Sequence, residues 1–111
     1  MTWVTVTKSF TVSAGATSTQ TIYTVTSGRK FRLKKARFWF PAGSNSELQA
    51  VILHGVEKVV PEDGYVAGDG QEFTYDVDIE YGSEEEVKAL LTNTSATDSH
   101  AVQITLEGEE A

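Results

Sequence analysis

The chain has 111 residues and a formal net charge of −7, with 16 acidic residues, nine lysines and arginines, and no cysteine. This length favours a single domain, residues 1–111, that can bury a core without disulfides. The lack of cysteine excludes disulfides and thiolate metal sites, and no segment approaches the roughly 18 apolar residues of a membrane helix. The first residues lack the basic and apolar regions of a secretory signal, so we expect a protein made in a cytoplasm and not inserted in a membrane.

Alternation of apolar and polar side chains predicts the first two strands. Over Trp3–Val12, apolar side chains occupy the even positions apart from Lys8, and threonine or serine occupies the odd positions from 5 onward. Successive strand residues point to opposite faces, so this run has one apolar and one polar face. A small polar loop follows at 13–18, and we expect a second strand over Thr19–Thr26.

The third strand, expected over Lys30–Phe40, changes phase along its length. Phe31 and Leu33 have odd numbers, whereas the later apolar set, Ala36, Phe38 and Phe40, has even numbers. A β-bulge inserts one extra residue and bends the strand, which would bring both sets onto one buried face. We therefore predict a bulge near Lys34 and Lys35.

The second half of the chain continues the β pattern. Leu48–His54 is apolar on both parities, which indicates a central strand or one covered on both faces. Pro61–Gly70 is the longest irregular stretch, and Gly82–Glu85 either seeds a helical turn or leads directly into a strand at Val87–Asn93. The remaining strands are expected at Glu57–Val60, Glu72–Tyr81 and Ala101–Leu106, with Gly108 and an acidic tail after them.

About eight short strands separated by turns are typical of an all-β fold with two packed antiparallel sheets. Eight is the strand count of a jelly roll, which we favour. An immunoglobulin-like sandwich has seven strands and often a buried tryptophan on its third strand. Trp39 could take that role, so both strand orders remain open at this point.

Charge is segregated along the chain. Six of the nine basic residues lie between 29 and 37, and fifteen of the sixteen acids lie at or after Glu57. The net negative charge disfavours nucleic acid as a partner, because affinity for phosphate needs local positive charge. The two sets of charges either pair across strands within one subunit or attract another copy of the chain.

No residue pattern indicates a catalytic site or a cofactor, so we predict that the protein is not an enzyme. His54 and His100 lack the spacing that brings two imidazoles to one metal, and no serine lies in a nucleophile elbow. The acids of the 61–70 loop offer an alternative, a calcium site, with Asp63 and Asp69 as candidate ligands. If the loop binds calcium, a calcium-dependent adhesion domain is a third hypothesis for the function.

An alternative function is a carbohydrate-binding or lectin-like domain. Such domains stack sugars on exposed aromatic rings, and Trp39 and Tyr65 are the candidate ligand-binding residues. Trp39 has the outward parity of its strand, beside Lys35 and Arg37.

Two segments resemble small β-sandwich virion proteins of tailed phages and archaeal viruses. The first is Ile22–Ala36, with Tyr-Thr-Val followed by Gly-Arg-Lys and an alternating strand, and the second is the last hairpin, 93–108. Together they cover about a third of the chain, and Thr26 stands where such proteins often carry proline. The resemblance implies a non-enzymatic capsid decoration (cement) protein, or a minor capsid or tail component, located in the virion.

Such a protein would act through contacts with itself, with a trimer as our guess, and with a capsid or tail protein. No nucleic acid and no membrane would take part. Tryptophan and arginine are enriched in protein interfaces, and the basic strand carries both. The residues that we predict at the interface are Arg32, Lys34, Lys35, Arg37 and Trp39, with Trp3 and the 61–70 loop as second choices.

Overall fold

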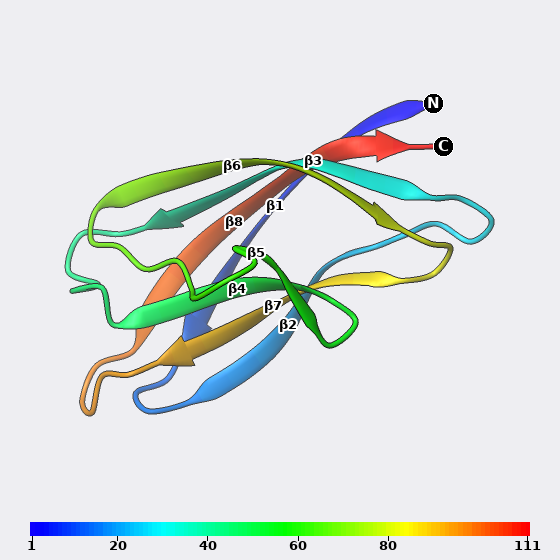
Figure 1. Cartoon of the computed structure of the whole chain (residues 1–111). Coiled ribbons are helices and arrows are strands. Elements are labelled where there is room, and N and C mark those ends of the chain that lie inside the picture. The colour runs from blue at the N-terminus through cyan, green and yellow to red at the C-terminus, as the bar shows by residue number, and fades with distance from the viewer.

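The computed structural model describes residues 1–111 and consists of eight strands in two antiparallel four-stranded sheets, with no helix (Figure 1). No helix is therefore present that could cross a membrane. The larger sheet has the order β1-β8-β3-β6 and the smaller one β2-β7-β4-β5. The strands are β1 (Thr2–Val12), β2 (Thr17–Thr24), β3 (Phe31–Phe40), β4 (Leu48–His54), β5 (Glu57–Val60), β6 (Gln71–Tyr81), β7 (Glu86–Asn93) and β8 (His100–Glu110).

Strand pairing is nested, and this identifies the fold. β1 pairs with β8, β2 with β7, β3 with β6, and β4 with β5, so the first half of the chain pairs with the second half in reverse order. Further pairing of β3 with β8 and of β4 with β7 completes the two sheets. This is the jelly roll. The immunoglobulin-like alternative is excluded, and Trp39 is 42% exposed instead of buried in the core.

The core lies between the two sheets, and β3 contributes most to it. All five of its inward side chains are fully buried, on both sides of the phase change. The pairing register of β3 shifts between Leu33 and Lys35 against both of its neighbours, β6 and β8. The predicted bulge is therefore confirmed, and it is what turns Leu33 and Ala36 toward the same core.

β4 is covered on both faces, as its sequence predicts. Leu48, Ala50 and Ile52 belong to the core cluster. Val51 and Leu53 point to the other side of the sheet, yet they are only 4% and 9% exposed.

The structure differs from the sequence-based prediction by more than one residue in two strands, β2 and β8. β2 runs over Thr17–Thr24, two residues earlier than expected. Of the two alternatives for residues 82–85, the structure shows a turn without a helix before β7. The acidic segment after Leu106 is strand, not a tail, because β8 continues to Glu110. It lies between β1 and β3 and pairs with both, so tertiary pairing outweighs the weak strand preference of its glutamates.

Gly108 is required where β8 passes β3. A Cβ atom at this position would lie 2.3 Å from the carbonyl oxygen of Arg32 and 2.8 Å from the ring of Phe31. Only glycine allows the two strands and this ring to approach so closely.

Candidate functional site

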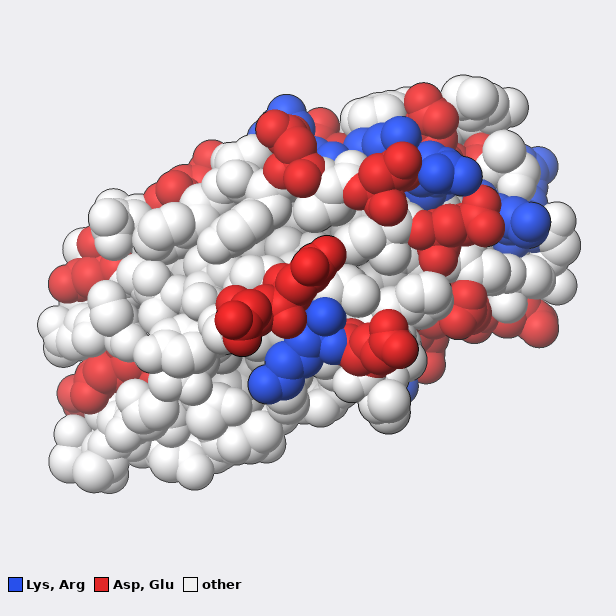
Figure 2. All heavy atoms as spheres, in the orientation of Figure 1, with Lys and Arg blue, Asp and Glu red and all other residues white.

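The outer face of the larger sheet carries the predicted interface residues. β3 is an inner strand of that sheet, and its outward side chains define what we call the basic strip: Arg32, Lys34, Lys35 and Arg37. An acidic outward row flanks the strip on β6, and two outward acids, Glu107 and Glu109, flank it on β8. Figure 2 shows positive and negative side chains interleaved on the surface over β3 and β6.

The basic strip is paired within the chain. On the β6 side, Arg32 contacts Asp78 Oδ1 at 3.0 Å and Glu80 Oε1 at 3.2 Å, and Lys34 lies 3.3 Å from the same Asp78 oxygen. Lys35 lies 3.7 Å from Asp76.

On the β8 side, Arg37 Nη2 lies 2.6 Å from Glu107 Oε2. Four of the six basic residues between 29 and 37 therefore pair with acids of the same chain, as the intrachain explanation of the charge segregation predicts. Exposed ion pairs of this kind contribute little to stability each.

Asp78 is the centre of this network. Its carboxylate accepts hydrogen bonds from Arg32 and then from Lys34, and these two bonds hold the pKa of Asp78 below its usual value. The same hydrogen bond raises the pKa of the Arg32 guanidinium. Asp78 and Arg32 therefore stabilise each other's charged forms.

The two tryptophans lie on this face but at opposite ends. Trp3 is 55% exposed and pairs with Glu109 of β8, whereas Trp39 pairs with Gln103 of the same strand. Six residues of β8 separate the two positions, which corresponds to roughly 20 Å at the usual rise of about 3.3 Å per residue. A contact that uses both tryptophans would have to cover the whole length of the sheet.

The structure separates the two aromatic residues that the carbohydrate hypothesis needs. Tyr65 is 53% exposed in the loop after β5, and its neighbour Val66 forms a bridge with Ala50 of the smaller sheet. Trp39 lies on the outer face of the larger sheet. Neither ring lines any of the hollows found in the structure.

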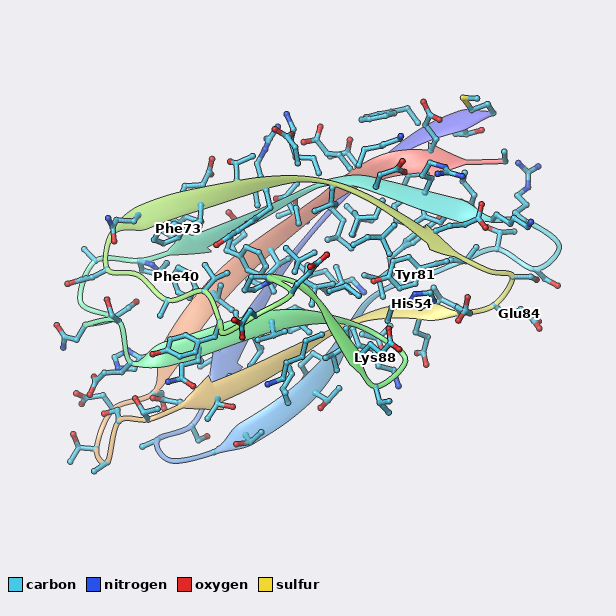
Figure 3. All side chains as sticks on the ribbon, viewed as in Figure 1. Phe40, His54, Phe73, Tyr81, Glu84 and Lys88 are labelled. Atoms are coloured by element: carbon cyan, nitrogen blue, oxygen red, sulfur yellow. The ribbon has the colours of Figure 1, made fainter.

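The inward side of β6 carries a row of half-buried apolar residues. Phe73 packs edge-on against Phe40, with 6.1 Å between ring centroids (Figure 3). Tyr81 is fully buried and its hydroxyl donates a hydrogen bond of 2.9 Å to the carbonyl of Leu53. Tyr75, which the alternation also assigns to the core, is only half-buried, because β6 lies at the edge of the sheet.

The candidate calcium ligands do not join a cluster of ligating groups. Asp63 is exposed, and Asp69 Oδ1 accepts a hydrogen bond of 2.6 Å from the main-chain nitrogen of Gly43. A different group of three does converge, Glu47, Asp98 and His100. Sequence reasoning missed it, because Glu47 is about fifty residues from the other two and only the fold brings them together.

Comparison with known proteins shows that this chain has the same fold as several solved structures. No family model matches the sequence, and neither does any curated protein. A chain from the Sulfolobus turreted icosahedral virus matches 98% of this chain, with a TM-score of 0.64 and 20% identity. A chain from the capsid of Helicobacter pylori bacteriophage KHP30 matches 100% of it, with a TM-score of 0.63 and 14% identity.

A third similar structure comes from an archaeal virus with a triple jelly roll fold and turret assembly, with a TM-score of 0.60 and 18% identity over 98% of this chain. The chain spans only 29% of each of the two archaeal virus chains, but 94% of the phage chain. The resemblance to virion β-sandwich proteins is confirmed as a resemblance of fold.

Proposed function

We propose that this protein is a structural component of a virion, and that it acts through contacts with other shell proteins and with copies of itself. The observation that carries the proposal is the match of the whole chain to 94% of a chain from a bacteriophage capsid, with the same jelly-roll fold. The matches to two archaeal virus chains support the same class of function. The proposal assigns the protein no catalytic step.

Within this class we favour a capsid decoration protein, or a minor capsid or tail component, that forms a homo-oligomer such as a trimer. The contact surface in this proposal is the outer face of the larger sheet. Its charges are already paired within the subunit, so they would set the orientation of a partner instead of supplying most of the binding energy. Trp39 and Trp3 offer the large exposed apolar side chains from which interfaces gain affinity.

Light scattering coupled to size exclusion, at low and high salt, tests the self-association. We expect a discrete oligomer in the wild type that Trp39→Ser weakens while the monomer stays folded. Val56→Ser is the matched control, because Val56 is 95% exposed on the smaller sheet's hairpin. A monomer at every concentration and salt would argue against self-association, and an equal effect of both substitutions would reject the proposed face.

Detection of the protein in particles tests the virion role separately. Particles purified on a density gradient from a culture that produces the protein should contain it in a fixed ratio to the major shell protein. Its absence from such particles would contradict the proposed function, whatever its oligomeric state.

A further inference from the structure

The end of the sandwich where the β3–β4 and β7–β8 connections meet carries a cluster of ligating side chains. Glu47 precedes β4, His100 begins β8, and Asp98 lies two residues before His100. One ligand atom from each of the three lies within 4.8 Å of the other two. This cluster is on a different part of the molecule from the basic strip.

His100 is held in a buried position. Only 6% of its side chain is exposed, and its Nε2 atom lies 2.9 Å from Glu47 Oε1. The carbonyl of Glu47 accepts hydrogen bonds of 2.9 Å from both the main-chain nitrogen and the hydroxyl of Thr94. The connection before β4 is thereby fastened to the one after β7, and the imidazole and carboxylate are preset next to each other.

Asp98 has a fixed main chain and a free carboxylate. The buried side chain of Asn93 donates a hydrogen bond of 2.8 Å to the carbonyl of Asp98, and Ser95 Oγ accepts one of 3.0 Å from its nitrogen. No hydrogen bond or ion pair engages the Asp98 carboxylate, and the residue is exposed. The side chain can therefore turn toward His100 without breaking a contact.

A hollow of about 370 Å³ opens beside the cluster. Asp98 and His100 line it together with Ser99, Ala101 and the 41–44 segment of the opposite connection. A group bound to the cluster would therefore have space on one side for water or a further ligand.

The donor types indicate which ion fits. Calcium and magnesium prefer ligand sets made only of oxygen, whereas an imidazole with carboxylates suits zinc and related divalent transition metals. Zinc bonds of about 2.0–2.1 Å place ligand atoms roughly 3.3 Å apart in a tetrahedron. His100 Nε2 and Glu47 Oε1, 2.9 Å apart, would separate by a few tenths of an ångström to admit the ion, and the exposed Asp98 side chain would rotate to supply the third ligand.

We propose that Glu47, Asp98 and His100 bind one divalent transition-metal ion, with Zn²⁺ as the first candidate, and leave a fourth position open toward the hollow. The bound ion would replace the direct contact of His100 with Glu47. It would join the β3–β4 and β7–β8 connections, and so stiffen this end of the sandwich. The proposal depends only on this chain and not on the virion role.

Calorimetric titration of the metal-free full-length protein with zinc chloride tests the site. Asp98→Asn removes one ligand charge at a side chain without other contacts, and Asp63→Asn removes the same charge from an exposed position in another loop. We expect one zinc ion per chain for the wild type and for Asp63→Asn, and at least tenfold weaker binding for Asp98→Asn. Calcium chloride at the same concentrations should give no binding.

A second pair of variants tests the imidazole. His100→Asn should abolish binding, whereas His54→Asn should leave it unchanged, and circular dichroism reports whether each variant folds. Cobalt chloride provides a spectroscopic check, since a Co²⁺ ion bound in a tetrahedral site absorbs strongly in the visible range. Absence of zinc binding by the wild type, or equal binding by Asp98→Asn and Asp63→Asn, would overturn the proposal.

Discussion

The two edge strands of the larger sheet, β1 and β6, have the same length and opposite surface chemistry. Both have 11 residues and one unpaired side. On β1 the exposed Lys8 interrupts the inward apolar row, and the outward row is mostly threonine and serine. On β6 the inward row is apolar from Phe73 to Tyr81 without a break, and the outward row is acidic at four of five positions.

The difference shows that the two edges are not equally protected. An inward charge on an edge strand prevents another strand from adding, since the ammonium group of Lys8 would have to be buried. On β6 three of the four outward acids are already paired with the basic strip, and the inward row carries no charge that an added strand would bury. We therefore expect β1 to stay free, and β6 to be the edge that tolerates a partner strand.

The largest effect is expected at Gly108, where β8 connects β1 to the rest of the sheet. Gly108→Ala should lower the free energy of unfolding by about 2–3 kcal/mol, because the new methyl group collides with the Arg32 carbonyl and the Phe31 ring. Urea denaturation measures the loss. Gln103→Ala, an exposed position on the same strand, is the control and should change the value by less than about 0.5 kcal/mol.

On β6, the buried and the half-buried tyrosine should respond differently. Tyr81→Phe leaves the buried carbonyl of Leu53 without its donor, which should cost about 1–2 kcal/mol. Tyr75→Phe should cost less than about 0.5 kcal/mol, since the Tyr75 hydroxyl makes no hydrogen bond within the chain and its edge-on contact with Phe38 is kept. Equal losses of unfolding free energy in the two variants, measured by thermal or urea unfolding, would mean that the hydrogen bond from Tyr81 to Leu53 does not stabilise the fold.

Removing the inward charge of Lys8 should make the edge of β1 as open to association as the edge of β6. Lys8→Leu should leave the free energy of unfolding within about 0.5 kcal/mol of the wild type, but it should produce larger species as concentration rises. Light scattering detects them. Ser9→Leu adds the same side chain to the outward row and keeps Lys8, so it should behave like the wild type. Larger species from both variants would mean that added apolar surface, not the lost charge, is responsible.

The smallest effect is expected from the acidic row of β6. The lowered pKa of Asp78 means that its ion pairs stabilise the fold above the unfolded pKa of about 3.9, and that this contribution disappears as pH falls through the lower folded value. Asp78→Asn should flatten the dependence of stability on pH below about 4, whereas Asp63→Asn should not. Unfolding curves at several pH values and at high salt, which screens exposed pairs, measure the difference.

Period-two alternation was sufficient to predict the strands, the bulge in β3 and the double coverage of β4. These features depend on neighbouring residues, so a single sequence contains the signal. The strand character of Glu107–Glu110 could not be predicted, because it comes from pairing with β1 and β3. The buried carboxylate of Glu110 shows the same limit: it accepts hydrogen bonds from Tyr23 and from the nitrogen of Thr26, more than eighty residues away.

The two candidate sites also differ in how much of them the sequence predicts. The outward direction of the basic strip follows from alternation, and its partners on β6 follow once the strand order is known. The strip's role in an interface stays a prediction. The Glu47, Asp98 and His100 cluster depends on how two loops approach each other, and loop conformation carries no periodic signal.

The nested strand order has a consequence for how the chain folds. In the innermost hairpin, β4–β5, residues as near in sequence as His54 and Glu57 pair with each other. In the outermost pairing, of β1 with β8, the paired residues are as distant in sequence as Thr2 and Glu110. Rates of folding fall as the sequence separation of contacts rises, so a fold of this type is expected to form in milliseconds to seconds. During synthesis β1 has no partner until β8 has left the ribosome. The inward lysine of this strand would then protect the nascent chain from association before its own edge is paired.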